Sequence, residues 1–595
     1  MESISFQKHW GSEFISADTV RFRLWAEGQN TMTLSLRDRD IIMEAVGDGW
    51  FQIDVAGLKH GDEYRFRLAD GTCIPDPAAR AQRDDVNGPS LIIDPRVYQP
   101  IHRDWKGRPW EETVIYELHP GTFTPEGTFQ AAIEKLPYLA ELGITQIEVM
   151  PVAQFGGSRG WGYDGVLLYA PHSAYGSPAD FHAFIDAAHG LGLSVVLDIV
   201  LNHFGPEGNY LPLLSPAFFH QQRMTPWGNA IAYETAAVRQ YISEAPLFWL
   251  TEYHLDGLRF DAIDQIEDRS ARHVLIEIAE NIRRAIPDRH IHLTTEDSRN
   301  VIFLHPRDEN GRTPLFTAEW NDDFHNAVHV FATGETHGYY QDFAHQPAKN
   351  AAKALAEGFV YQGEISPQTG QSRGVKCSEQ PPQFFVDFIQ NHDQTGNRAQ
   401  GERLISLAGA EKTRVLLAAL LLSPHIPLLF MGEEYGETNP FLFFTDFKGE
   451  LAKAVREGRA KEFAGHTGHD ESVPDPNDPD TFIRSKLDWQ QAASEEGKSW
   501  LRFTRDLLRL RHRYIVPLLT EGGPVESRIL HTDPQTLAVS WLFPGATLSV
   551  ALNIGDKSFA IPDVPGEVIF SWPERRDALT ADSIVVRFAN GEASS

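Results

Sequence analysis

The stretch FQAAIEKLPYLAELGITQIEVMPV, residues 129–152, contains one complete helix-to-strand unit. Residues 129–143 are amphipathic and end in glycine, which is common at the C-terminus of a helix. Residues 147–152 form a short apolar run of the kind that makes a buried strand. The stretch PADFHAFIDAAHGLG, 178–192, and the apolar run at 195–203 repeat the arrangement. Helices that alternate with buried strands are typical of a parallel sheet in an α/β protein.

Eight apolar runs of this kind occur between residues 114 and 436. They are VIYELHP (114–120), IEVMPV (147–152), VVLDIVLNH (195–203), GLRFDAI (257–263), IHLTTE (291–296), LFTAEWN (315–321), QFFVDFIQNHD (383–393) and PLLFMGEEYG (427–436). Eight strand–helix units predict a closed (β/α)8 barrel, the TIM-barrel architecture. The alternative is an open doubly wound sheet, which would carry a Gly-rich phosphate-binding turn after its first strand. VIYELHP is not followed by such a turn.

Regions of alternating apolar and polar residues flank the barrel sequence and predict two further domains. Period-2 patterns at 19–24, 31–36 and 64–68 favour a small immunoglobulin-like β-sandwich at the N-terminus. The tail alternates again in LAVSWLF, LSVALNI and IVVRF. We expect a β-sandwich at 1–95, a Pro-rich linker at 96–110, the barrel at 111–515 and a small all-β domain at 516–595. Within the barrel region, about 446–495 reads as a polar loop and 499–514 as a helix.

Charge and cysteine content exclude several classes of protein. The chain has 82 acidic and 53 basic residues, a formal net charge of −29, which argues against a nucleic-acid or anionic-membrane partner. Its two cysteines, Cys73 and Cys377, predict neither a disulfide framework nor a cysteine metal site. No signal-peptide pattern opens the sequence, and no apolar run is long enough to span a membrane. A cytoplasmic location without a cofactor is expected.

Polar residues gather where the predicted strands end. Asp198 and His203 belong to the third strand, Arg259 and Asp261 to the fourth, and Glu296 ends the fifth, while His392 and Asp393 follow the seventh. Catalytic residues of a (β/α)8 barrel lie at the carboxyl ends of its strands, so we expect these side chains on one rim. Arg259 and Asp261 share one face of their strand. Taken alone, this pair would be read as a structural ion pair.

Three carboxylates, an arginine and two histidines without a metal-binding motif suit glycosidic bond cleavage. One carboxylate attacks the anomeric carbon and one carboxylic acid protonates the leaving oxygen. Asp261 suits the first role, because the adjacent Arg259 is expected to lower its pKa. Glu296 suits the second role, which needs a raised pKa, because no Lys or Arg lies within two positions of it.

Four short segments carry a family resemblance. DIVLNH (198–203), GLRFDAI (257–263), TTED (294–297) and NHD (391–393) resemble, in order and spacing, the conserved regions of the α-amylase superfamily. The resemblance implies a retaining mechanism with Asp261 as nucleophile, Glu296 as general acid/base and Asp393 as transition-state stabiliser. It also implies that Arg259, His203 and His392 hold the sugar before the scissile bond. Tyr163, in GWGYDG, is similar to the tyrosine that stacks on this sugar in the family.

Five longer stretches narrow the resemblance to the maltooligosyltrehalose trehalohydrolases of that superfamily. They are residues 74–90, 114–129, 319–335, 388–404 and 439–447. The resemblance implies hydrolysis of the α-1,4 bond next to the terminal trehalose of maltooligosyltrehalose, downstream of a maltooligosyltrehalose synthase, by a monomer or homodimer. One alternative is a branching or debranching enzyme, since the N-terminal sandwich resembles theirs. Another is a barrel that only binds polysaccharide, which would be expected to lack one of the three carboxylates.

Further polar residues have two readings. Asp198 either contacts the sugar or supports its neighbours. Asn321, Asp322 and His325 follow the sixth strand and either bind hydroxyls of the +1 or +2 glucose or form the N-terminus of a helix, where Asp is favoured. Asn202 would be a calcium ligand only within a cluster of oxygen ligands, and none is visible, so no metal is predicted.

Overall fold

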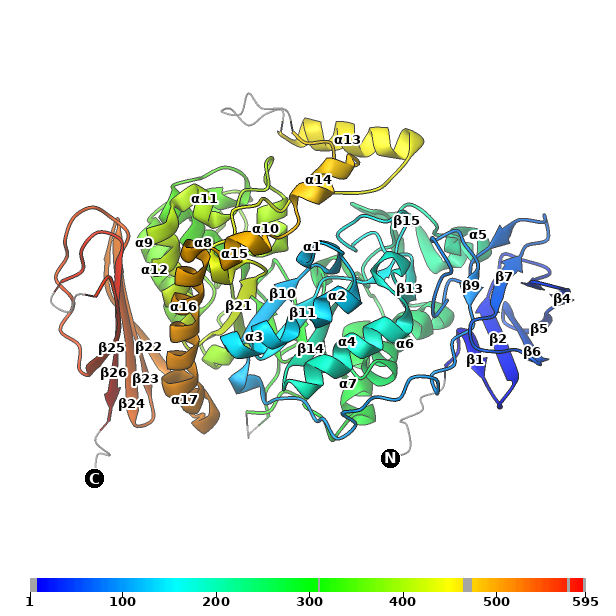
Figure 1. Ribbon diagram of the computed structural model, residues 1–595, viewed down its shortest axis with the longest axis horizontal. Helices are drawn as coiled ribbons and strands as arrows, with labels where there is room; N and C mark the ends of the chain where they lie inside the picture. The colour runs from blue at the N-terminus through cyan, green and yellow to red at the C-terminus, as the bar shows by residue number, and fades with distance from the viewer. Residues whose placement is uncertain (1–7, 309–310, 464–472, 575–577, 592–595) are drawn as a thin grey trace.

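The centre of the molecule is a closed barrel of eight parallel strands (Figure 1). The computed structural model describes residues 8–308, 311–463, 473–574 and 578–591. The barrel strands are β10 (Ile115–Leu118), β11 (Gln146–Val149), β14 (Ser194–Ile199), β17 (Gly257–Phe260), β18 (His292–Thr295), β19 (Ala318–Trp320), β20 (Phe385–Asp387) and β21 (Ile426–Phe430). Each overlaps one of the eight predicted strands in the predicted order, so the expected barrel is confirmed.

Buried residues on both faces explain why these strands read as continuous apolar runs. Every residue of β11 and β17 is buried, because the barrel interior covers one face and helices cover the other. The larger helices are α3 (Leu136–Leu142), α4 (Pro178–Gly190), α6 (Ala236–Glu252), α7 (Val274–Ala285), α8 (Asp322–Thr333), α9 (Pro347–Glu357), α12 (Ala410–Leu421) and α16 (Glu495–Leu510). The short ones are α1 (Pro120–Phe123), α5 (Leu211–Leu214), α10 (His392–Gly396), α11 (Leu404–Ala408) and α17 (Val516–Glu521).

The helix expected at 129–143 is divided in two. Residues Phe129–Ile133 form α2, and α3 starts at Leu136 with Pro137 in its first turn. Proline has no N–H to donate to the preceding turn, so it fits the start of a helix and not its interior. Gly143 ends α3 with φ of 112°, as the sequence predicts.

The N-terminal region consists of two antiparallel sheets at one end of the barrel (Figure 1). The first contains β1 (Gly11–Phe14), β2 (Thr19–Trp25), β6 (Trp50–Ala56) and β5 (Glu44–Gly47). The second contains β4 (Asp40–Ile42), β3 (Thr33–Leu36), β7 (Glu63–Arg67), β8 (Cys73–Ile74) and β9 (Ser90–Leu91). His9 and Trp10 join this region to α6 through Glu244 and the Ala237 carbonyl.

A five-stranded antiparallel sheet lies at the opposite end of the barrel, as expected for the C-terminal tail (Figure 1). Its order is β22 (Glu526–Asp533), β23 (Thr536–Phe543), β24 (Ala546–Asn553), β26 (Ser583–Asn590) and β25 (Glu567–Trp572). The Trp572 indole donates to Glu411 of α12 at 3.0 Å. This sheet lies far from the barrel's centre in Figure 1.

The region expected as a polar loop, about 446–495, is largely helical. It contains α13 (Gly449–Phe463), α14 (Pro479–Arg484) and α15 (Trp489–Ala493), and its residues 464–472 lie outside the described ranges. The loop expectation was wrong because α13 consists of good helix formers with almost no apolar face, Arg459 being its buried residue. Arg459 donates to the Gly396 carbonyl at 2.8 Å, which ties α13 to α10.

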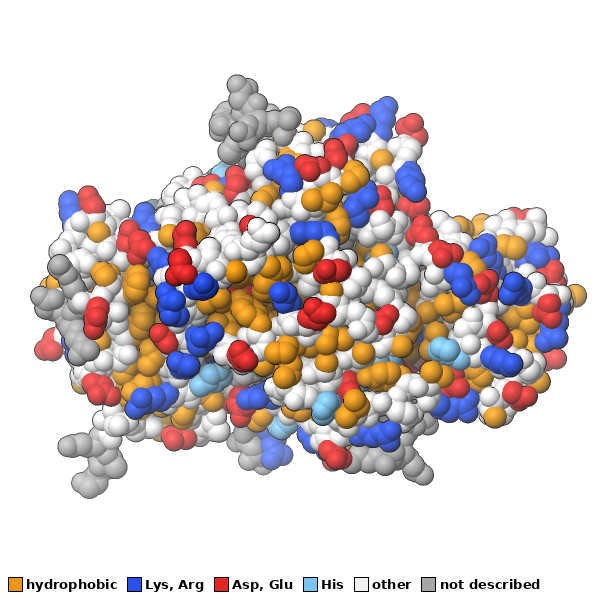
Figure 2. Space-filling view, in the orientation of Figure 1, with side chains coloured by type: hydrophobic (Ala, Val, Ile, Leu, Met, Phe, Trp, Pro, Cys, Tyr) orange, Lys and Arg blue, Asp and Glu red, His pale blue; other side chains and the backbone are white. Residues whose placement is uncertain are grey.

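Acidic and basic side chains are intermingled on the face shown in Figure 2. Within the part of the chain that the structure describes, no helix is long and apolar enough to cross a membrane.

Two antiparallel strand pairs lie outside the barrel on the loops after the second and third barrel strands. They are β12 (Ala153–Gln154) with β13 (Leu167–Pro171), and β15 (Phe219–Thr225) with β16 (Gly228–Ile231).

Candidate active site

Arg259 is the centre of a carboxylate cluster at the rim of the barrel. Its Nη1 donates to Asp198 Oδ2 at 2.6 Å and to Asp261 Oδ1 at 2.9 Å. Its Nη2 lies 2.7 Å from Glu296 Oε2. The guanidinium is only 1% exposed, and an arginine this buried requires paired charges. One cation therefore holds three carboxylates from three neighbouring strands.

The register of the barrel explains this convergence. Asp198 is paired with Arg259 across β14 and β17, and Arg259 is paired with Thr294 across β17 and β18. Asp261 lies two residues after Arg259 and Glu296 two residues after Thr294, just beyond the ends of β17 and β18. Since side chains two apart share a face, all of these groups point to the same end of the barrel interior.

The backbone makes an unusual bend directly after Asp261. Ala262 has φ of 41°, in the left-handed region that residues other than glycine seldom adopt. This conformation allows its N–H to donate to Glu296 Oε2 at 3.0 Å, while Ile263 N–H donates to the Glu296 carbonyl at 3.0 Å. The bend therefore links the carboxylate of the fifth strand to the end of the fourth.

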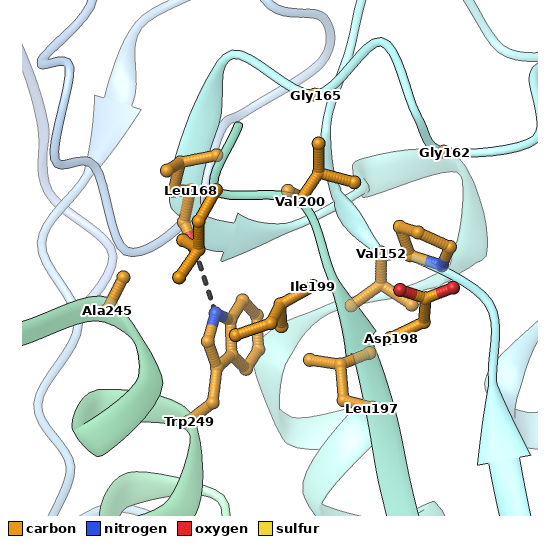
Figure 3. A pocket seen from close by; sticks show the side chains of 13 residues that line it. Val152, Gly162, Gly165, Leu168, Leu197, Asp198, Ile199, Val200, Ala245 and Trp249 are labelled. Atoms are coloured by element: carbon orange, nitrogen blue, oxygen red, sulfur yellow. Dashed lines mark hydrogen bonds between the residues drawn. The ribbon is translucent and has the colours of Figure 1, made fainter. Parts of the chain in front are cut away.

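Aromatic and apolar side chains pack around the Arg259 carboxylate cluster. The Arg259 guanidinium lies 4.0 Å from the centre of the Trp320 ring, a cation–π contact. Figure 3 shows Asp198 on one side of β14 and the Ile199 and Trp249 side chains on the other, in an apolar pocket. Burial raises the pKa of Asp198, while Arg259 acts in the opposite direction.

Asp261 and Asp198 have further partners. Asn202 Nδ2 donates to Asp261 Oδ2 at 3.1 Å, and the Tyr163 hydroxyl donates to Asp198 Oδ2 at 2.6 Å. Asp198 is 2% exposed and makes its hydrogen bonds to Tyr163 and Arg259. This geometry agrees with the supporting reading of Asp198. Asp261 and Glu296 retain 12% and 19% side-chain exposure.

The pKa directions differ in part from those expected from sequence. Burial raises the pKa of Asp261, and Arg259 opposes this without reversing it. The expected lowering is therefore wrong as a net effect, because the removal of water outweighs the adjacent cation. The pKa of Glu296 is also raised by burial and by Asp261, although Arg259 again opposes the change. Sequence spacing missed this Arg259 contact, which forms through space across β17 and β18.

His392 and Asp393 lie beside this cluster. Asn391 forms the N-cap of α10 and accepts the Asp393 N–H at 2.9 Å, and Asn397 donates to Asp393 Oδ1 at 2.6 Å. The Tyr163 and His392 rings are stacked with centroids 5.1 Å apart. Burial raises the pKa of Asp393, His392 lowers it and Glu296 raises it, which shows that the three groups interact.

His203 is held in place on the other side of Tyr163. Its Nε2 donates to the Tyr163 carbonyl at 2.8 Å, and its Nδ1 lies against the Asn202 side chain. Burial lowers its pKa to about 4, so the ring is neutral at pH 7. The half-exposed Trp227, in the turn between β15 and β16, stacks on it at 4.3 Å.

The three candidates after the sixth strand have different environments. Asn321 is the N-cap of α8, accepts the Phe324 N–H, and donates to Asp387 and to the Gly358 carbonyl. His325 donates from Nδ1 to the Ile389 carbonyl and accepts the Tyr340 hydroxyl at Nε2. The oxygen and nitrogen of the Asn321 side-chain amide and both ring nitrogens of His325 therefore have protein partners.

Asp322 instead remains partly exposed near the carboxylate cluster and accepts a hydrogen bond from Gln394 at 3.1 Å. Burial, Glu296 and Asp393 raise its pKa to about 8. This raised pKa favours the protonated form of the Asp322 carboxyl group, which can donate a hydrogen bond.

Sequence reasoning missed several buried acids on the barrel strands, among them Glu117 on β10 and Glu148 on β11. Each is 1% exposed. Both interrupt an apolar strand with a charged residue, the same signal that Arg259 gives on β17. Within the described ranges, no group of three or more His, Cys, Asp or Glu residues could hold a metal ion.

Comparison with known proteins identifies two family regions. The family described as "Alpha amylase, catalytic domain" matches residues 66–212 and 218–510. A domain of unknown function, DUF3459, matches residues 526–589. The first match covers more than half of the chain and includes every strand of the barrel.

Two curated relatives that match most of the chain share a name. A malto-oligosyltrehalose trehalohydrolase of Deinococcus radiodurans is 42% identical over 563 residues, 93% of this chain and 90% of that protein. The Saccharolobus solfataricus protein of the same name is 41% identical over 84% of this chain and 86% of that protein. A 1,4-alpha-glucan branching enzyme of Photobacterium profundum is 33% identical, over 37% of this chain and 34% of that protein.

A solved structure extends the comparison. A protein of Salmonella typhimurium, solved as a candidate alpha amylase, is 70% identical with a TM-score of 0.97, covering 98% of this chain and 100% of that one. The extent of these matches favours the trehalohydrolase resemblance over the branching-enzyme alternative. The chain belongs to the α-amylase family and, within it, to the malto-oligosyltrehalose trehalohydrolases.

Proposed function

We propose that this protein is a retaining glycosidase that cleaves the α-1,4 bond next to the terminal trehalose of maltooligosyltrehalose. The products are trehalose and a maltooligosaccharide. The observation that carries the proposal is the single Arg259 guanidinium that holds Asp198, Asp261 and Glu296 within 2.9 Å at the rim of the barrel. The names of relatives that match over most of the chain support the choice of substrate.

In this mechanism Asp261 attacks the anomeric carbon while Glu296 protonates the leaving oxygen. The raised pKa of Glu296 suits an acid, because a group that donates a proton near neutral pH must still carry it. Water then attacks the glycosyl-enzyme bond with Glu296 as base, which regenerates both groups. Asp393 lies beside His392 and stabilises the positive charge that develops on the ring.

The proposed sugar contacts come from side chains that lie in or beside the Arg259 carboxylate cluster. Tyr163, His203, Arg259 and His392 surround the sugar before the scissile bond, and Asp322 contacts the +1 or +2 glucose. Asn321 and His325 are not assigned to the sugar, because Asn321 caps α8 and His325 is bound by the Ile389 carbonyl and the Tyr340 hydroxyl. Asp198 acts by holding Tyr163 and Arg259.

Incubation with maltotriosyltrehalose tests the proposal. We expect stoichiometric trehalose and maltotriose, with the new maltotriose reducing end first formed as the α-anomer. Products without trehalose would overturn it. Iodine staining of treated amylose would reveal branching activity, and soluble polysaccharide binding without product would support the non-catalytic alternative.

The remaining context is also a proposal. We place the enzyme in the cytoplasm, where a maltooligosyltrehalose synthase supplies its substrate. We propose that it is a monomer or homodimer, and light scattering can distinguish the two.

We propose domains at 1–95, 111–515 and 516–595, with a linker at 96–110. The absence of barrel strands before Ile115 and after Phe430 among the described residues supports this division.

A further inference from the structure

Glu117 makes two contacts with one residue of the proposed sugar site. Its Oε2 accepts the His392 backbone N–H at 3.1 Å, and its Oε1 accepts the hydrogen on His392 Nδ1. The Glu117 and His392 side chains are 1% and 3% exposed. A buried carboxylate that is bound to both the backbone N–H and Nδ1 of one histidine fixes the orientation of its ring and favours a positive charge on it.

The edge of the imidazole that carries Nε2 points away from Glu117 and can bind another group. Among the residues that the structure describes, none hydrogen-bonds to His392 Nε2, while Tyr163 stacks on the ring at 5.1 Å. Trp161 meets the same ring edge-on at 5.6 Å. The ring is therefore clamped by Glu117 and by aromatic side chains, with Nε2 on the edge away from Glu117.

Charge explains why the protonation state of this ring matters. A neutral imidazole that donates from Nδ1 to Glu117 has only a lone pair at Nε2, whereas an imidazolium donates at both nitrogens. Charged or titratable groups interacting with the ring are Glu117, His119, Tyr163, Asp198, Arg259, Asp261, Glu296 and Asp393. Burial lowers the pKa of His392 and Arg259 lowers it further, but Glu117 and Asp393 together raise it above its ordinary value.

We propose that Glu117 is a positioning residue for the hydrolysis, which keeps His392 as an imidazolium whose Nε2–H donates to a sugar hydroxyl. The same positive charge keeps the adjacent Asp393 ionised. Glu117 does not touch the sugar and acts through His392. The sugar contact rests on the proposed function, whereas the protonation state of His392 can be measured without any substrate.

The variant Glu117→Gln tests this assignment, because it keeps the size of the side chain and removes its charge. Nitrogen-15 NMR of the histidine rings, with His392→Gln used to identify the signal, should show His392 doubly protonated at pH 7.5 in the wild type and neutral in the variant. We expect kcat/KM for maltotriosyltrehalose to fall about tenfold or more at pH 7.5. The deficit should shrink as the pH falls, because a lower pH restores the proton that His392 loses together with the Glu117 charge.

Glu244→Gln is a matched control. Glu244 accepts from the backbone N–H and from Nδ1 of His9, the same pair of contacts that Glu117 makes with His392, at the junction of the N-terminal region with α6. This variant should leave the His392 signal and the pH dependence of kcat/KM unchanged.

Two results would overturn the inference. One is a His392 ring that stays doubly protonated in Glu117→Gln at pH 7.5, and the other is a variant-to-wild-type ratio that does not change with pH. If Glu117→Gln does not fold, a neutral His392 in the wild type at pH 7.5 overturns it alone. Wild-type protein that releases no trehalose would refute the proposed function and leave the NMR result standing.

Discussion

Replacing Glu296 with glutamine should separate proton donation from the structural contacts of the same side chain. Within the described chain, the Glu296 carboxylate makes two contacts through Oε2, an ion pair with Arg259 at 2.7 Å and a hydrogen bond from Ala262 N–H at 3.0 Å. A glutamine oxygen can accept both. The amide nitrogen then occupies the place of Oε1, the oxygen that we propose carries the catalytic proton.

The expected loss of kcat follows from the contacts that the glutamine keeps. A positioned general acid contributes about 10²–10⁴-fold. Because the glutamine keeps the Arg259 and Ala262 contacts, binding should change little and the loss should fall on kcat. We expect kcat for maltotriosyltrehalose to drop about 10³-fold, which corresponds to about 4 kcal/mol in activation free energy.

A substrate that needs no proton provides the assay. With α-maltotriosyl fluoride, Glu296→Gln should release a burst of fluoride equal to the enzyme concentration, at a rate within about tenfold of wild type. Turnover should then stall, because the base that activates water is missing, and azide should restore it. Asp261→Asn is the control, since it lacks the nucleophile and should show no burst.

Two results would refute this reasoning. The first is natural-substrate activity in Glu296→Gln within tenfold of wild type. The second is a fluoride burst slowed as much as trehalose release, which would mean that Glu296 acts on binding or on fold and not on the leaving group.

Three further predictions test other parts of the site. Arg259→Lys should lower kcat/KM at least about tenfold and thermal stability by about 5 °C or more, because a point charge cannot bridge three carboxylates; activity and calorimetry matching the wild type would contradict this. Asp322→Asn should raise the unfolding temperature relative to wild type more at pH 8 than at pH 5. The folded-state pKa of Asp322 is about 8, so the stability that the neutral carboxyl group contributes is fully present below the unfolded pKa and is lost as the pH rises towards 8. A difference in unfolding temperature that does not change with pH would contradict this prediction. Asn321→Ala should reduce the free energy of unfolding by about 1–2 kcal/mol, the usual loss of an N-cap, with KM changed less than about twofold; a large rise in KM with unchanged stability would instead make it a sugar ligand.

The barrel was predictable because its strands are short, buried on both faces and separated by amphipathic helices. Polar residues that interrupt or end such strands stand out, as Arg259, Asp261 and Glu296 do. Glu117 in VIYELHP gives the same signal. The charged helix α13 has no apolar stripe, so apolar periodicity does not reveal it.

Sequence could not reveal which polar groups are already paired. Asn321 has the residue type of both a sugar ligand and an N-cap, and only the fold shows that Asp387 takes up its amide. The Arg259–Glu296 contact depends on the register between β17 and β18, which brings residues 37 apart in the chain within 2.7 Å. The net pKa direction of Asp261 likewise depends on how much water the folded site excludes.

The left-handed backbone at Ala262 sets thermal stability against catalytic rate. Holding a residue other than glycine in this conformation costs about 1–3 kcal/mol. Glycine at this position would relieve that strain, so selection for heat tolerance alone would favour it. The freer peptide would steady Glu296 less firmly, and a more robust catalyst would then be a slower one.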